Sequence, residues 1–421
     1  MNLFLTIFAV VYLAEHLTEF ILSSLNLRQT RKNEAEIPAF FREKISMEEY
    51  QKSIAYTRAK AKLGLLESAV LGIVFWLFLL TGSYGAAEQW SRSLGLSAIP
   101  SGLLFLFFWA LIFRLASLPF SFYARFVIEE RFGFNQTTGK LWLLDLGKGI
   151  LLATVLGGAV GWGVLWFMNR FYHSPWWLLV WLFLAAVQLF MVSLYPILIV
   201  PVFNKLTPLP EGSLKGKIEE LARSVKFRVS GIFVMDGSKR SGHSNAFFSG
   251  TGKYRRIVLF DTLLSSLKED ELLAVLAHEM GHNVRNHVRT ALLLSLGFSL
   301  AGLYILSHLA RAPWFYEAFH FSQPSAPAAL FIFASIYGAF TFWLSPLLSG
   351  LSRKHEYEAD RFALMTQKAA DPMIRALVKL SRENLANLTP HPLYSLFYYS
   401  HPATMERILA LQQIQSSPAS L

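Results

Sequence analysis

Seven long apolar stretches dominate this chain and limit the folds that it can adopt. They cover residues 4–25, 63–81, 103–120, 143–168, 176–200, 291–310 and 328–348. A helix of about 20 mostly apolar residues crosses a bilayer, and only helices and closed barrels satisfy their backbone hydrogen bonds there. Only 16% of the residues are charged, against roughly 25% in a soluble domain. The sequence therefore predicts a mainly α, multi-span integral membrane protein with about seven transmembrane helices.

Basic residues alternate between rich and poor loops. Residues 26–62 include nine Lys and Arg, whereas residues 82–102 include Arg92 alone. Because Lys and Arg gather in cytoplasmic loops, we expect the N-terminus outside, and the segment after the fifth stretch and the C-terminus in the cytoplasm. The membrane would be a bacterial inner membrane or, in a eukaryote, the endoplasmic reticulum. These loops account for the net charge of +11, and no nucleic-acid-binding motif accompanies it.

The chain divides into four predicted parts. Residues 1–203 form membrane helices one to five, and residues 204–290 form a small cytoplasmic α+β segment. Residues 291–350 form helices six and seven, and residues 351–421 form a C-terminal segment. Within the second part, alternation and periodicity predict a helix at 214–224 and strands at 230–235 and 256–260. We also expect one helix over 269–289 that runs into the sixth apolar stretch.

Several ionisable residues fall within or beside the apolar stretches, where charge is costly. They are Glu15, Glu19, Glu67, Arg114, Asp145 and Lys148. Two interpretations remain open at this point. The charges pair between neighbouring helices, or they line a water-filled internal cavity.

A metal-binding motif stands in the cytoplasmic segment. His278, Glu279 and His282 follow the pattern H-E-x-x-H. Residues four apart lie on one face of a helix, so the two imidazoles can reach one zinc ion. Glu279 can reach a metal-bound water as general base without binding the metal. The pattern fixes only three positions, and the alternative is a helix that carries it without function.

A third ligand is expected after the seventh apolar stretch. The chain has no cysteine, so a metal must be bound by His, Asp or Glu. In the segment SRKHEYEADRFA, helical spacing places Glu356 and Asp360 on one face and Glu358 off it. We expect Glu356 to bind the metal and Asp360 to orient a ligand histidine or tie two helices together. The alternative is an acidic patch on a surface helix.

Other histidines lie near these motifs. His287 is five residues from His282, an offset that does not place both on one face of a continuous helix. We therefore expect a structural or interfacial role for it. The same expectation holds for His243, His355 and His391.

At this point the chain resembles a known family. H-E-x-x-H together with SRKHEYEADRFA is similar to the type I CaaX prenyl endopeptidases, the membrane zinc metalloproteases that convert a-factor in yeast and process lamin in animals. Five further segments match that family in order. They are LPFSFYARFVIEERFGFNQTT (118–138), YPILIVPVFNKLTPLPEG (195–212), DGSKRSGHSNAFFSG (236–250), RRIVLFDTLL (255–264) and YSHPATMERI (399–408).

The resemblance implies seven membrane helices around a water-filled chamber, with a small α+β zinc metallopeptidase domain that holds one Zn²⁺ per chain. It implies peptide or protein substrates, cut near the C-terminus, with or without a prenyl group, within the lipid bilayer. It assigns the metal ligands to His278, His282 and Glu356. His401 would steady the oxyanion, and Arg407 matches the family arginine nearby. Asn245, Ala246 and Phe247 would form the strand edge that pairs with the substrate backbone.

Two features depart from the family as it occurs in animals. The chain is shorter, and its tail lacks a dilysine retrieval signal, so we expect a prokaryotic or divergent member. Two other functions stay open: a broad-specificity protease for membrane-protein quality control, and a transporter or scaffold with a non-catalytic zinc. The sequence leaves the oligomeric state open, and a monomer is compatible with every role above.

Overall fold

The computed structural model describes residues 2–249 and 255–416, and seven of the helices in these ranges are long and apolar enough to cross a membrane. The spans are α1 (Leu3–Lys32), α2 (Met47–Leu80), α4 with its continuation (Ala98–Phe132), α6 (Gly139–Arg170), α7 (Trp176–Leu194), α12 (His287–Leu309) and α14 with its continuation (Ala326–Gln367). Each overlaps one of the seven predicted stretches, which confirms the predicted fold class. The end of the tail, which bears on the missing retrieval signal, lies outside the described residues.

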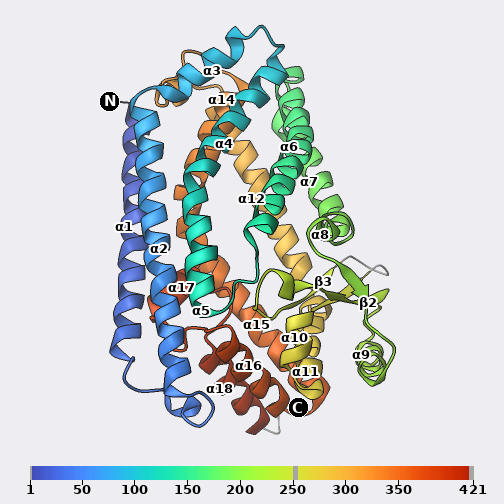
Figure 1. Ribbon diagram of the computed structural model, residues 1–421. Helices are drawn as coiled ribbons and strands as arrows, with labels where there is room; N and C mark the ends of the chain where they lie inside the picture. The colour runs from blue at the N-terminus through green and yellow to red at the C-terminus, as the bar shows by residue number, and fades with distance from the viewer. Residues whose placement is uncertain (1, 250–254, 417–421) are drawn as a thin grey trace.

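Shorter elements cap the two ends of the elongated body (Figure 1). At the end near the N-terminus lie α3 (Ser83–Ser93) and α13 (Pro313–Glu317). Toward the other end lie α5 (Glu130–Phe132), α8 (Val200–Phe203), α9 (Ser213–Ser224), α10 (Asp261–Ser266), α11 (Glu269–Val284), α16 (Asp371–Glu383), α17 (Pro392–Tyr398) and α18 (Thr404–Ser416). The third span comprises α4 (Ala98–Tyr123), a wider turn (Ala124–Glu129) and α5. The seventh comprises α14 (Ala326–Thr341), a tight turn (Phe342–Leu344) and α15 (Ser345–Gln367).

Local sequence explains where the spans begin and bend. α2 begins with a capping box, because Ser46 and Glu49 each accept a hydrogen bond from the other's backbone N–H. Pro119 lies inside α4 just before the wider turn, where a missing N–H loosens the helical ladder. The fifth predicted stretch extends to residue 200, but α7 ends at Leu194 and passes through a second wide turn (Tyr195–Ile199) into α8.

The two largest hydrophobic cores lie at opposite ends of the body. An aromatic core joins α1, α2, α3 and α4 to α13 and α14, with Phe8, Tyr84, Phe105 and Phe319 fully buried. The second core joins the sheet to α9, α11, α16 and α18. The spans between them bury little of their surface. In the first six spans, only 6–17% of the residues in the most apolar segment are buried. Their remaining surface faces lipid or an interior space.

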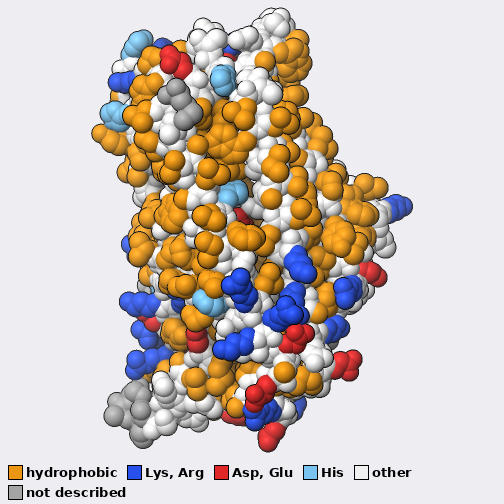
Figure 2. Space-filling view, turned by 90° about the vertical axis from the view of Figure 1, so that its left-hand side faces the viewer, with side chains coloured by type: hydrophobic (Ala, Val, Ile, Leu, Met, Phe, Trp, Pro, Cys, Tyr) orange, Lys and Arg blue, Asp and Glu red, His pale blue; other side chains and the backbone are white. Residues whose placement is uncertain are grey.

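The surface shows the same division (Figure 2). Hydrophobic side chains cover the middle of the face that it shows. Lys and Arg side chains gather mainly in the lower part, toward the C-terminal helices. A band of apolar surface bounded by basic residues is the pattern of a protein that sits across a bilayer.

A four-stranded sheet accompanies α11. Its order is β1 (Leu206–Pro208), β2 (Gly231–Met235), β4 (Arg256–Phe260) and β3 (Ala246–Ser249). β2 and β4 are parallel, in the register Gly231 to Arg256, whereas β1 and β3 are antiparallel to their neighbours. Both predicted strands are confirmed as the central pair. The two outer strands were not predicted as strands from periodicity, and β3 forms one edge of the sheet.

The close packing of α11 against α15 positions the site. Gly281 makes this approach possible, since a Cβ atom there would lie 3.1 Å from the Cα of Ala359 and 3.2 Å from the Cβ of Phe362. The predicted continuous helix over 269–289 is wrong. α11 ends at Val284, and α12 begins after Asn286, whose φ of +61° cannot continue a right-handed helix. By contrast, α15 runs without a break across residue 350, so the seventh span and the acidic segment share one helix.

Gly281→Val should force α11 away from α15. Overpacking of a tight contact costs about 1–3 kcal/mol, so we expect a lower unfolding temperature together with reduced metal content. Gly297→Val is the matched control, because a Cβ atom at this position of α12 meets nothing within 4 Å. Thermal unfolding in detergent and metal analysis measure the two effects. Equal behaviour of the two variants would contradict the close approach.

Candidate metal centre

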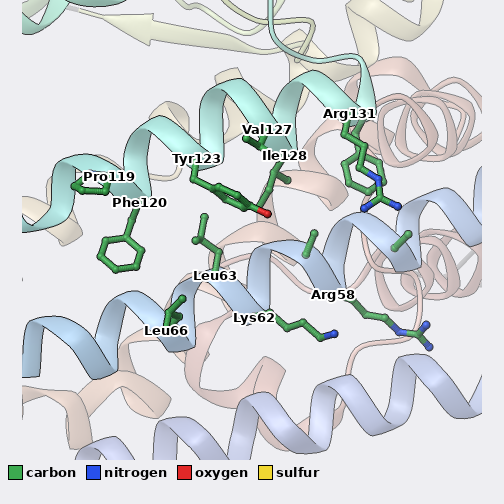
Figure 3. A pocket seen from close by; sticks show the side chains of 13 residues that line it. Arg58, Lys62, Leu63, Leu66, Pro119, Phe120, Tyr123, Val127, Ile128 and Arg131 are labelled. Carbon is green, nitrogen blue, oxygen red and sulfur yellow. The ribbon is translucent and has the colours of Figure 1, made fainter.

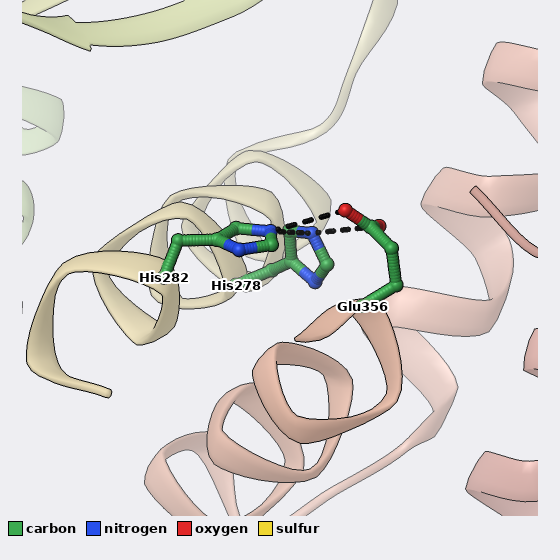
Figure 4. A group of neighbouring side chains, drawn as sticks. All are labelled: His278, His282 and Glu356. Carbon is green, nitrogen blue, oxygen red and sulfur yellow. Dashed lines mark hydrogen bonds and ion pairs between the residues drawn. The ribbon is translucent and has the colours of Figure 1, made fainter. Parts of the chain in front are cut away.

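Three potential metal ligands from two helices lie together (Figure 4). His278 and His282 project from α11, and Glu356 projects toward them from α15. The Nε2 atoms of the two imidazoles are 3.2 Å apart. The carboxylate oxygens of Glu356 lie 3.4 Å from Nε2 of His278 and 3.2 Å from Nε2 of His282.

This triangle fits a tetrahedral metal ion. Bonds of about 2.0–2.1 Å in a tetrahedral zinc site place neighbouring donor atoms roughly 3.3–3.4 Å apart, which matches the three distances. Oε2 of Glu356 is buried and forms no hydrogen bond within the described residues, although buried polar atoms are normally paired. Three donors also leave one tetrahedral position open, as catalytic sites require.

Asp360 holds His278 in the orientation that metal binding needs. Nδ1–H of His278 donates to Oδ1 of Asp360 at 2.8 Å, which leaves Nε2 directed at the donor triangle. Arg407 on α18 in turn donates from Nε and Nη2 to the two oxygens of Asp360 at 2.8 and 2.6 Å. All three side chains are buried. The arginine also lies 3.4 Å from Oε2 of Glu356, so it compensates the charge of both carboxylates.

The same contacts change the protonation of His278. Burial alone would lower the pKa of this imidazole, but the neighbouring carboxylates of Asp360 and Glu356 raise the pKa to about 9. A metal ion requires neutral imidazole. A metal that binds here near neutral pH therefore displaces a proton from His278. The affinity of the site for the metal should rise with pH until the pH reaches the pKa of about 9.

His282 has a similar support that sequence reasoning missed. Nδ1 of His287 lies 3.0 Å from Nδ1 of His282, and Nε2 of His287 lies 3.0 Å from a carboxylate oxygen of Glu358. His355 stacks on His287 with the ring centroids 4.0 Å apart. The five-residue offset argued against such a contact only on a continuous helix. The break at Asn286 turns the start of α12 back toward the site.

The other predicted site residues surround the ligands. Glu279 follows His278 on α11 and is half-buried, and His401 precedes α18. Nε2 of His401 lies 3.3 Å from Oε1 of Glu356, although 65% of the His401 side chain is exposed. The structure thus brings His401 and Arg407 to the same carboxylate from the C-terminal segment.

The predicted substrate-binding residues form the start of the edge strand. Asn245 immediately precedes β3, and Ala246 and Phe247 are its first two residues. The carbonyl of Asn245 accepts from the N–H of Phe260 on β4 at 3.1 Å. The next N–H, that of Ala246, donates instead to Oδ1 of Asn245 at 2.8 Å. The N–H of Ala246 therefore forms no hydrogen bond with β4 and lies at the free edge of the sheet. β3 also lies against α11.

Comparison with known proteins decides the family. Residues 26–205 match the model of the CAAX prenyl protease N-terminal region with five membrane helices, and residues 208–415 match peptidase family M48. The chain belongs to the CAAX prenyl protease family. It is therefore a multi-pass membrane metalloendopeptidase, which argues against a transporter or a non-catalytic scaffold.

Relatives in this family match most of the chain. The CAAX prenyl protease 1 of Saccharomyces cerevisiae is 36% identical over 93% of this chain and 92% of its own length. The human homologue of CAAX prenyl protease 1 is 35% identical over 75% of this chain and 74% of its own. The crystal structure of S. mikatae Ste24p superposes with a TM-score of 0.90 at 33% identity, over 97% of this chain and 98% of that one.

Asp360→Asn should weaken metal binding in this family member. The amide oxygen still accepts from His278, but the charge that balances Arg407 is lost, and such supporting contacts typically change metal affinity by about 10–100-fold. Titration of the metal-free protein with zinc measures the effect. Asp371→Asn is the control, because Asp371 is exposed at the start of α16 and pairs only with Arg375 among the described residues. Equal affinities in both variants would remove the orienting role of Asp360.

Proposed function

We propose that this chain is a zinc endopeptidase that hydrolyses peptide bonds near the C-terminus of prenylated CaaX-type or other membrane-associated peptides. The observation that carries the proposal is the triangle of His278, His282 and Glu356, with donor atoms 3.2–3.4 Å apart. One zinc ion per chain, held by these residues, would supply a Lewis acid that polarises the scissile carbonyl and makes water a nucleophile at neutral pH. The donor set of two imidazoles and one carboxylate is one that catalytic zinc uses.

The chain's own residues would move the protons and position the reacting groups. Glu279 would take a proton from the attacking water and then deliver it to the leaving amine. His401 would donate a hydrogen bond to the oxygen that becomes negative. Its exposed side chain and its place beside Glu356 support this role. Asp360 and Arg407 would keep His278 in the required tautomer.

The substrate would add to β3 as an extended strand. An edge strand offers N–H and C=O groups to a peptide, whatever the side chains of that peptide are. The N–H of Ala246, held only by the side chain of Asn245, supports this role. Phe247, on the same strand, would contact substrate side chains.

We further propose that the site faces a water-filled chamber, with the catalytic end and the C-terminus in the cytoplasm and the N-terminus outside. The accessible surface of 21,655 Å² exceeds the roughly 16,000 Å² of a compact monomer of this mass. An elongated shape and an interior surface both contribute to the excess. The basic residues around the metal end support the orientation, in a bacterial inner membrane or the endoplasmic reticulum.

Glu279→Gln should retain the metal and lose catalysis. General acid–base catalysis contributes about 10²–10⁴-fold, so kcat for a model peptide should fall by at least 100-fold with unchanged zinc content. Glu269→Gln is the control, since Glu269 lies about 15 Å away along the same helix. Glu356→Ala should differ from both by losing zinc itself. Wild-type turnover of Glu279→Gln would exclude the general-base role.

A prenylated and an unprenylated version of one peptide separate the two substrate classes that remain. A CaaX-type enzyme should show a kcat/KM at least tenfold higher for the prenylated peptide. A quality-control protease should cleave both alike, and the sequence-tolerant backbone pairing at β3 favours this second candidate. If the zinc-loaded protein cleaves neither peptide, the result would contradict both substrate classes.

A further inference from the structure

A groove on α2, α4 and α5 has no part in the proposed proteolytic site (Figure 3). Its volume is about 740 Å³. α2 forms one wall, and the end of α4 with the following turn forms the other. One end of the groove carries cationic side chains, and the remainder is apolar. Neither wall contributes a residue to the metal centre.

The groove crosses the boundary of the membrane-spanning region. The apolar stretch of α2 begins at Leu63, and Lys62 and Arg58 come directly before it. The lining of the other wall stays apolar as far as Ile128, and Arg131 follows three residues later, about 5 Å further along the helical path. The headgroup region of a bilayer adds roughly 5–8 Å on each side of the hydrocarbon core. The groove therefore extends from the acyl-chain region into the headgroup region.

The positive charge of the groove is only partly compensated. None of its lining residues is acidic. Arg58 is engaged, because its guanidinium pairs with both carboxylate oxygens of Glu34 at 2.7 and 3.2 Å. Lys62 and Arg131 form no ion pair with any carboxylate in the described part of the chain, and the guanidinium of Arg131 lies over the ring of Phe132. Two free cations thus stand at the polar end.

The rest of the lining is suited to a hydrocarbon chain. Leu66, Tyr123 and Val127 are 56%, 49% and 41% exposed, although all three are large and apolar. Tyr123 and Leu63 point toward each other across the groove, and Leu66 and Val127 also line it. Exposed apolar side chains beside unpaired cations match a ligand that is anionic at one end and aliphatic along its length.

We propose that this groove binds an anionic phospholipid, with its phosphate at Lys62 and Arg131 and an acyl chain along Leu66, Tyr123 and Val127. Basic pockets between membrane helices on the cytoplasmic side bind anionic headgroups in this manner. A free phosphate leaves the apolar wall uncovered, and a zwitterionic lipid brings its own cation beside Lys62 and Arg131. The lipid bridges α2 and α5, so it stabilises the native bundle by mass action.

The test is native mass spectrometry of the delipidated, full-length protein, titrated in detergent with phosphatidylglycerol or phosphatidylcholine. We expect one phosphatidylglycerol to bind roughly tenfold or more tightly than phosphatidylcholine, since each nearby Lys or Arg contributes a factor of about five. Lys62→Ala/Arg131→Ala should abolish the preference. Lys52→Ala/Arg28→Ala, which removes two exposed cations on α2 and α1 outside the groove, should keep it.

A second pair of variants keeps the test valid if the first misfolds. Leu66→Trp/Val127→Trp should fill the apolar wall and reduce phosphatidylglycerol binding while leaving both cations in place. Thermal unfolding should show a stabilisation by phosphatidylglycerol in the wild type and in Lys52→Ala/Arg28→Ala only. Equal binding of both lipids, equal losses in both charge variants, competition by inorganic phosphate as strong as that of the lipid, or a dimer that closes the groove would each overturn the proposal.

Discussion

Three helices that are far apart in the sequence meet at the carboxylate of Asp360. It accepts from Nδ1 of His278 on α11 and from two nitrogens of Arg407 on α18, all in a buried environment. A buried charge left without its partners is strongly destabilising, so each of the three groups requires the other two. The donor triangle depends on this network, because it fixes the tautomer of His278 and draws α15 onto α11. The proposed zinc chemistry follows from that geometry.

The membrane spans are held together in a different way. The aromatic core at one end and the sheet-and-helix core at the other hold the spans together, and the spans between these cores bury little of their apolar surface. The proposed chamber for substrate and water would lie between these cores, with lipid against the outer faces. The proposed lipid groove on α2, α4 and α5 would extend this lipid-facing surface to the headgroup level.

The metal centre and the edge strand are built on rigid elements, as precise catalysis requires. α11 carries two of the proposed ligands and the proposed base, and β3 lies against it. The break at Asn286 lets α12 place His287 behind His282, so each proposed ligand histidine has a carboxylate in reach: Asp360 directly for His278, and Glu358 through His287 for His282. Loss of a supporting contact of this kind typically changes metal affinity by about 10–100-fold.

The sequence by itself determined the seven spans, the two central strands and the helical spacing of His278, His282, Glu356 and Asp360. The length of each apolar stretch and the periodicity of helices and strands set these features, and both are properties of neighbouring residues in the sequence. The helix break, the contact between His287 and His282, and the groove on α2, α4 and α5 were decided only by the tertiary structure. How the elements pack decides three features: the positive φ at Asn286, the close approach that Gly281 permits, and the pairing of cations with distant carboxylates. The local sequence pattern does not specify that packing.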